Sequence, residues 1–259
     1  MGPVSTAQNA AVLSAAERRK RSALELFTGR ILSSRVGPHV AKVIVFGSVP
    51  EHRSTPESDV DVIILAGSQL QGVEDAAADA AFDVGMISGE SVEPLVYPLN
   101  ELRYPSSYFI HRSLLHGEEV YSMDDVALKA EECRGYRDLA AEYLDGAKDA
   151  LKQAHSRLAV DAAYNAAELC AKGLLLFELK DLPTSHGGVV VKFAQCFVKE
   201  GPLPRALGKS FNKALLWRNK SRYDRAVTIG SNEAEEAIKL AEEMIRVVDQ
   251  RHGDMENRD

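Results

Sequence analysis

Two short apolar runs, separated by a polar loop, stand near the start of the sequence. Residues 43–46 end at the pair Gly47-Ser48, and residues 60–65 begin beside Asp59 and Asp61. Both runs are rich in β-branched residues and bounded by turn residues, which predicts two buried strands. Two such strands restrict this part of the chain to a fold built on a sheet.

The two aspartates predict a metal site. Successive side chains of a strand point to opposite faces, so Asp59 and Asp61 share one face. Two neighbouring carboxylates repel unless a positive charge lies between them. Mg²⁺, or Mn²⁺ in its place, prefers such oxygen ligands, and the tight turn at Gly47 and Ser48 offers N–H groups to a phosphate. The alternative is two strand-end aspartates in a solvated turn.

The spacing of these residues resembles a known signature. Gly47-Ser48, ten intervening residues and then Asp59-Val60-Asp61 resemble the motif of polymerase-beta-type nucleotidyltransferases, and among them the minimal nucleotidyltransferases. The resemblance implies an Mg²⁺-dependent transfer of a nucleoside monophosphate, AMP from ATP, to a hydroxyl acceptor. It also implies that Gly47 and Ser48 hold the triphosphate.

The loop after this turn departs from the family. The family carries an Arg and a Gly a few residues after the Ser, whereas this chain has Glu51 and His52. Arg53 is the nearby cation that we expect to replace the lost charge at the nucleotide. The departure leaves open an alternative, a catalytically weak nucleotide-binding regulatory module.

A third carboxylate is needed for a second metal, and in the family it lies on the strand beside the Asp-x-Asp strand. Residues 69–81 are rich in Ala, Glu and Asp and predict a crossover helix, and residues 82–88 then predict a strand. Asp83 is the acid in that run, so we expect it to complete the second metal site and to favour deprotonation of the acceptor. The alternative is an Asp that caps a turn. Residues 91–97 contain proline and predict an edge strand.

The character of the chain changes after Met123, where strand signals vanish. We therefore predict an α+β domain over residues 1–122, with a small mixed sheet, and an all-α helical bundle over residues 123–259. Residues 1–10 are expected to be disordered. Apolar residues at helical spacing predict the helices of the bundle: residues 124–154, 160–179, 189–199, 205–220 and 232–249.

The second half resembles the HEPN family of helical domains, which often accompany minimal nucleotidyltransferases. The matching stretches are residues 161–169, 184–190 with the following Phe193, 197–201 and 218–224. The resemblance implies a homodimer through the helical half. HEPN ribonucleases carry an Arg, then four to six intervening residues, then a His, but no His follows Arg218 before His252, which argues against ribonuclease activity.

Two kinds of acceptor remain open at this stage, besides the catalytically weak regulatory module. The two-part layout resembles that of aminoglycoside and lincosamide nucleotidyltransferases, which keeps a small-molecule hydroxyl open as the acceptor. A toxin–antitoxin-like protein would instead modify or restrain its own HEPN half, with AMP on Tyr223. Arg218 and Tyr223 are candidates for an inter-domain cleft or a modification site.

The composition constrains the partners and the cellular compartment that we expect for this chain. The net charge of −7 argues against extended nucleic-acid binding and an anionic membrane. No apolar run has the length of a membrane span. The three widely spaced cysteines argue against a disulfide framework, so we expect a reducing cytoplasm.

Overall fold

The computed structural model describes residues 14–256, with side chains up to Arg251. The expectation of disorder for residues 1–10 therefore lies outside the described residues. The chain divides into two compact units, Met1–Met123 and Asp124–Asp259.

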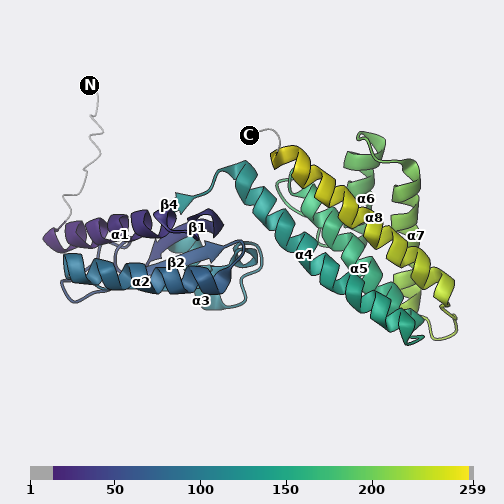
Figure 1. Ribbon diagram of the computed structural model, residues 1–259, viewed down its shortest axis with the longest axis horizontal. Helices are drawn as coiled ribbons and strands as arrows, with labels where there is room; N and C mark the ends of the chain where they lie inside the picture. Colours follow the sequence, from purple (N-terminus) through teal and green to yellow (C-terminus); the bar gives the residue numbers. More distant parts are fainter. Residues whose placement is uncertain (1–13, 257–259) are drawn as a thin grey trace, which may run out of the picture. The chain divides into compact units, whose positions relative to one another are not determined.

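The first unit is a four-stranded sheet with helices (Figure 1). Its main elements are α1 (Ala15–Ser33), β1 (Val40–Phe46), β2 (Val60–Ala66), α2 (Leu70–Ser88), β3 (Val92–Pro98), α3 (Tyr108–His116) and β4 (Glu118–Ser122). Two short 3₁₀ turns lie between them, Gly37–His39 and Leu99–Leu102.

The strand order in the sheet is β3-β2-β1-β4. β1 pairs antiparallel with β2 and with β4, and β2 pairs parallel with β3. A parallel pair needs a long crossover, which α2 supplies. The predicted mixed sheet is confirmed, including the proline-containing strand at its edge.

The strand predicted over residues 82–88 is wrong, because α2 continues through these residues to Ser88. The apolar residues of this stretch fall on two sides of the helix: Val84 is buried, whereas Phe82 and Met86 are exposed. The helix ends at Gly89, whose φ of 72° is left-handed. The buried residues recur at helical spacing along the whole element: Val73, Ala77, Ala80 and Val84.

One face of the sheet carries α1 and α2, which lie side by side (Figure 1). Val60, Val62 and Ile64 belong to the apolar cluster formed with these two helices. Because side chains alternate along a strand, Asp61 of β2 points to the opposite face. The packing of the apolar residues therefore decides which side of the sheet presents the acid.

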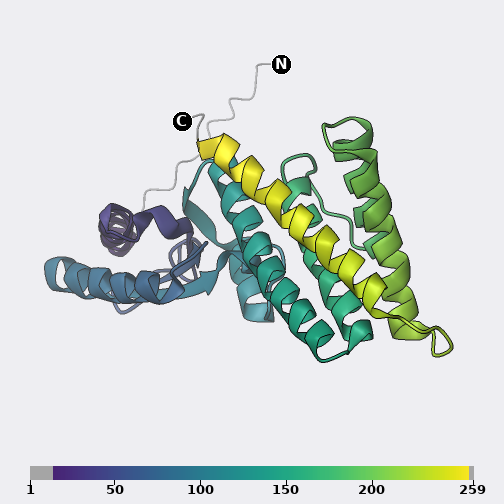
Figure 2. The ribbon, with the colours of Figure 1, turned by 45° about the vertical axis from the view of Figure 1, so that its right-hand side comes forward.

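The second unit is helical throughout its described part. Helices α4, α5 and α8 pack against one another along their lengths (Figure 2), and no strand occurs between residues 124 and 256. The predicted all-α bundle is confirmed. Its elements are α4 (Asp125–Lys152), α5 (Ser156–Leu175), α6 (His186–Phe193), a π-helical turn (Ala194–Lys199), α7 (Arg205–Tyr223) and α8 (Ser231–Glu256).

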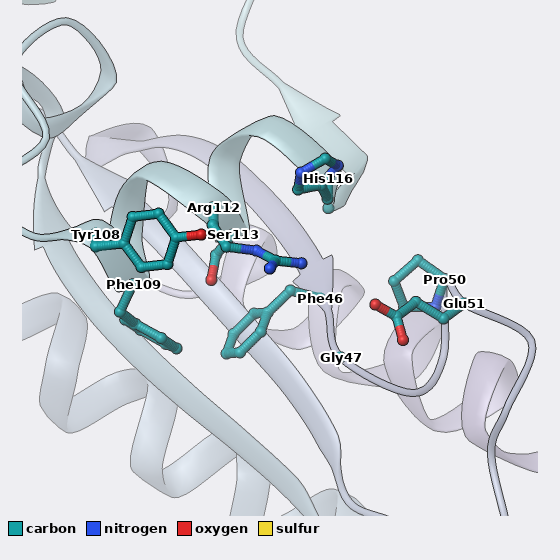
Figure 3. A pocket seen from close by; sticks show the side chains of 10 residues that line it. Phe46, Gly47, Pro50, Glu51, Tyr108, Phe109, Arg112, Ser113 and His116 are labelled. Atoms are coloured by element: carbon teal, nitrogen blue, oxygen red, sulfur yellow. The ribbon is translucent and has the colours of Figure 1, made fainter.

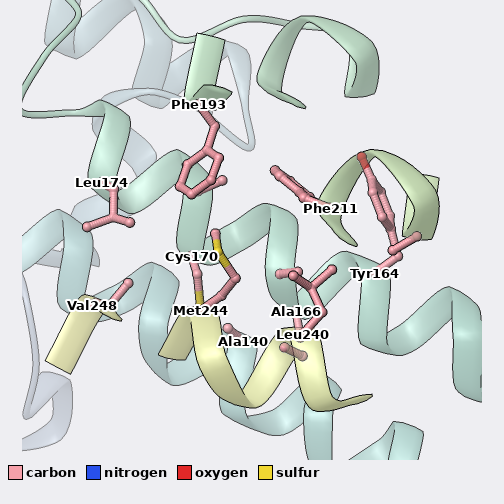
Figure 4. Packing of buried hydrophobic residues seen from close by; sticks show 14 of the residues in the cluster. Ala140, Tyr164, Ala166, Cys170, Leu174, Phe193, Phe211, Leu240, Met244 and Val248 are labelled. Carbon is pink, nitrogen blue, oxygen red and sulfur yellow. The ribbon is translucent and has the colours of Figure 1, made fainter. Parts of the chain in front are cut away.

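An aromatic group holds α5, α6 and α7 together (Figure 4). The ring of Phe211 lies 5.8 Å from that of Tyr164 and 5.5 Å from that of Phe193. All three side chains are fully buried. Aromatic pairs at this separation stabilise a core by about 0.5–1.5 kcal/mol each beyond the area they bury.

Candidate functional site

Three carboxylates lie near one another at one end of the sheet. In the register of the sheet, Asp61 of β2 lies directly opposite Phe46 of β1 on one side and Glu93 of β3 on the other. Neighbouring strands are about 4.8 Å apart, and residues in register present their side chains to the same face. Asp59 precedes β2 by one residue, so the acids are Asp59, Asp61 and Glu93.

The turn after β1 packs directly onto this group. Gly47 has a φ of +74°, and a Cβ atom placed on it would lie 2.4 Å from the Oδ2 atom of Asp61. No L-residue fits there without moving the carboxylate. Glycine is therefore required at position 47 both for the backbone conformation and for the close approach to Asp61.

No residue that the structure describes forms an ion pair that would balance the charge of these three acids. Partial burial raises the pKa of Asp61, and the negative charges of Glu93 and Asp59 raise it further. Within residues 14–251, none of these three carboxylates forms an ion pair. In the described part of the chain, no three His, Cys, Asp or Glu side chains are already gathered as a metal site. An all-carboxylate donor set without a cation nevertheless fits a hard divalent ion such as Mg²⁺.

Helix α1 holds the loop between the glycine turn and the aspartates. Glu17 contacts the ring Nδ1 of His52 at 3.0 Å, and Lys20 donates to the carbonyl oxygen of Pro56 at 3.4 Å. Lys20 is 1% exposed and also pairs with Glu90. Lys20 of α1 therefore positions the loop.

Arg53 does not stand free beside the turn. Its guanidinium pairs with Glu51 in the same loop, and its side chain is 74% exposed. The charge of Arg53 is thus already balanced by a neighbouring carboxylate, which weakens the expectation that it replaces the missing arginine of the family loop.

The structure does not bring Asp83 to the acids. Asp83 lies on α2, and its carboxylate pairs with Arg30 of α1 at 2.6 Å. Both helices cover the sheet face that holds Val60 and Val62, whereas Asp61 points to the other face. Placing Asp83 on a strand beside Asp61 was therefore wrong, because residues 82–88 are helical.

Sequence reasoning missed Glu93, although the signal for it was present. The edge strand at residues 91–97 was expected, and Glu93 is the acid inside it. Only the pairing of β3 with β2 shows that this strand is the neighbour of the Asp-x-Asp strand. Glu93 therefore takes the position that the sequence had assigned to Asp83.

A cavity of about 320 Å³ opens beside the turn (Figure 3). The end of β1 and α3 form its walls, and the Phe46 and Phe109 rings pack edge to face, 5.5 Å apart. Its polar lining includes Glu51 of the loop and Arg112 and His116 of α3. The cavity shares Gly47 with the acid site.

Comparison with protein families matches both halves of the chain. A nucleotidyltransferase domain model matches residues 29–107, and a HEPN domain model matches residues 134–251. The chain joins a nucleotidyltransferase domain to a HEPN domain. The resemblance inferred from the sequence is confirmed for both domains.

Individual relatives cover different parts of the chain. A UPF0332 protein of Thermotoga maritima is 32% identical over 115 residues, which are 44% of this chain and 86% of that protein. The structure of TT1696 from Thermus thermophilus has 23% identity and a TM-score of 0.41, with 46% of this chain and 97% of that one covered. The structure of a spectinomycin adenyltransferase from Enterococcus faecialis, with ATP and spectinomycin, has 12% identity and a TM-score of 0.31, with 87% and 99% covered.

The two candidate residues of the HEPN domain lie in different surroundings. Arg218 of α7 is 5% exposed, lies 3.5 Å from a carboxylate oxygen of Asp161, and keeps a buried Nε atom without a hydrogen bond. Tyr223 ends the same helix and is 75% exposed. Arg218 therefore belongs to the interior of this domain, whereas Tyr223 is accessible on its surface.

None of the helices in the described residues has both the length and the apolar character that spanning a membrane requires.

Proposed function

We propose that the nucleotidyltransferase domain transfers a nucleoside monophosphate, AMP from ATP, to a hydroxyl group. The observation that carries the proposal is the register of Asp61 with Glu93, with Asp59 beside them and the Gly47 turn against the Asp61 carboxylate. Three acids without an ion-pair partner among the described residues, beside a glycine turn, suit an Mg²⁺-bound triphosphate.

Each residue has a role in this proposal. Mg²⁺, held by Asp59, Asp61 and Glu93, would neutralise charge on the phosphates during transfer. Ser48 and the N–H groups of its turn hold the terminal phosphates. Glu93 favours loss of the acceptor proton. The acceptor oxygen bonds to the α-phosphorus while the α–β phosphoanhydride bond breaks, and pyrophosphate leaves.

The test uses the full-length protein with each α-labelled nucleoside triphosphate and Mg²⁺. Pyrophosphate release is measured, and label is traced in the protein and small-molecule fractions. We expect release with ATP, loss of release and of Mg²⁺-dependent binding in Asp61→Asn, and slower turnover with binding retained in Glu93→Gln. Asp83→Asn is the matched control, because it removes an acid of the same domain on the other face of the sheet.

Two results would contradict this assignment. Pyrophosphate release that survives Asp61→Asn would place the chemistry elsewhere. Asp83→Asn and Glu93→Gln losing turnover equally would show that register in the sheet does not select the third acid.

A second acceptor is the HEPN domain itself. Tyr223 presents a hydroxyl that is 75% exposed, next to the Arg222 guanidinium, which pairs with Asp161. We propose it as the first protein hydroxyl to examine for covalent AMP, in which case the nucleotidyltransferase domain regulates the HEPN domain. Mass spectrometry after incubation with ATP should locate the adduct on Tyr223, and Tyr223→Phe should remove it. Label found in the small-molecule fraction alone would exclude this acceptor.

A further inference from the structure

We infer that Arg112 of α3 binds the terminal phosphates of the nucleotide and supplies the positive charge that the loop after Ser48 lacks. The inference rests on the proposed function, since it requires a triphosphate at the Gly47 turn. It adds a binding residue from a helix far along the chain.

The position of Arg112 carries the first part of the argument. Arg112 lines the cavity that begins at Gly47 (Figure 3), and the side chain extends from α3 into the space between the helix and the turn that carries Glu51. The packing of Phe109 against Phe46 fixes α3 on the end of β1. Phe46 is in register with Asp61, so Arg112 lies on the face of the sheet that presents the acids.

The basic side chains near the turn differ in whether a carboxylate already balances their charge. Arg53, which precedes the aspartates in the loop, is engaged with Glu51. Lys20 and Arg21 of α1 are paired with Glu90 and Glu118. By contrast, Arg112 is exposed and forms no ion pair with any residue that the structure describes.

The chemistry of the cavity suits a phosphate chain. Glu51 also lines it, but Arg53 balances that carboxylate, so the uncompensated charge of the cavity is the cation of Arg112. A guanidinium can donate two parallel hydrogen bonds to phosphate oxygens. His116, one turn further along α3, lines the same wall and carries an imidazole that can donate a further N–H.

The direction of the nucleotide follows from this arrangement. The acids on β2 and β3 lie on one side of Gly47 and the cavity on the side of β1 and α3. With the α-phosphate at the acids, the β- and γ-phosphates extend across the turn toward Arg112. Arg112 should therefore distinguish ATP from AMP.

The experiment compares Arg112→Ala, Arg112→Lys and Arg35→Ala in the full-length protein. Arg35 is a matched control: it is exposed, unpaired among the described residues, and lies before β1, at the opposite end from Gly47. Binding of an ATP analogue with a methylene group between the α- and β-phosphorus atoms is measured by calorimetry with Mg²⁺, and binding of AMP in parallel. Circular dichroism checks folding, and the lysine variant keeps the charge.

We expect Arg112→Ala to weaken binding of the ATP analogue by about 10- to 100-fold, the effect of losing a hydrogen bond to a charged group. AMP binding should change by less than about 3-fold, Arg112→Lys should be intermediate, and Arg35→Ala should leave both unchanged.

The outcomes separate the two proposals. If the wild type binds the analogue only with Mg²⁺ but Arg112→Ala binds it like Arg35→Ala, Arg112 is an ordinary surface residue and only this inference fails. Equal weakening for AMP and the analogue would also overturn it, because the contact would not be to the terminal phosphates. If the wild type binds no nucleotide, the proposed function fails and this inference with it.

Discussion

Replacing Gly47 by alanine tests how the turn and the Asp61 carboxylate depend on each other. The added Cβ would stand 2.4 Å from Oδ2 of Asp61, and ordinary contact begins at 3.4 Å. Either the carboxylate or the turn must therefore move by about 1 Å. The substitution also places an L-residue at a φ of +74°, which costs about 1–2 kcal/mol.

Gly89→Ala separates these two effects. Gly89 ends α2 with a φ of +72°, and nothing lies within 4 Å of a Cβ placed on it. It therefore carries a similar backbone cost without touching the site. We expect urea denaturation to show a loss of about 1–2 kcal/mol of stability in Gly89→Ala, and at least as much in Gly47→Ala.

The rate of pyrophosphate release should differ strongly between Gly47→Ala and Gly89→Ala. A displacement of about 1 Å at reacting groups costs roughly 100-fold in rate, so pyrophosphate release should fall by about that factor in Gly47→Ala and should persist in Gly89→Ala. The assay is pyrophosphate release with ATP and Mg²⁺ at a temperature where both variants are folded. Equal turnover in the two variants would refute the argument that glycine is needed at position 47 to keep the Asp61 carboxylate in place.

Three further predictions concern charge and assembly. The pKa of Asp61 is raised in the folded protein. Between the pKa of Asp61 in the unfolded state and its higher pKa in the folded state, the metal-free folded protein therefore binds more protons than the unfolded chain. Stability should fall as the pH rises through that window, and Asp61→Asn should stabilise the metal-free protein at pH 7 in urea denaturation; a destabilised Asp61→Asn variant would contradict this. Burial alone would raise the pKa of Glu168, but the hydrogen bond with His186 and the charge of Lys172 outweigh it and lower the pKa. The ionised Glu168 therefore stabilises the folded state, and this stabilisation should be lost as the pH falls through the folded-state pKa. His186→Ala should cost about 1–3 kcal/mol at pH 7, with a smaller further loss on acidification than in wild type, and an unchanged acid response would refute the pairing. We also predict a homodimer through the HEPN domain, which a monomeric mass in light scattering at micromolar concentration would refute.

The local sequence was sufficient to predict those features that a few adjacent residues define. Gly47, Ser48, Asp59 and Asp61 were recognisable because a turn and a strand start are defined by adjacent residues. The two domain types were also predictable, since the loss of period-two patterning after Met123 changes the kind of core that the chain can form.

Predicting which residue is the third acid required knowledge of how the strands pair. Residues 82–88 look like a strand because they are short and apolar, and such a run cannot be distinguished from a helix segment by composition alone. In the folded unit, Val84 continues the buried stripe of α2, so Asp83 turns outward to Arg30. Glu93 reaches the site instead, because β3 pairs with β2 in a register that places it opposite Asp61.

The sequence by itself determined the chemistry that the site can offer: a glycine turn, two spaced carboxylates and a loop in which Glu51 replaces a basic residue. The tertiary structure decided which other residues lie on the same face of the sheet. Glu93 and Arg112 come from a strand and a helix that follow the motif in the chain, and sheet register and the Phe46–Phe109 contact bring them to the same face. Local patterns specify elements, but hydrogen-bond register and packing between elements select their neighbours.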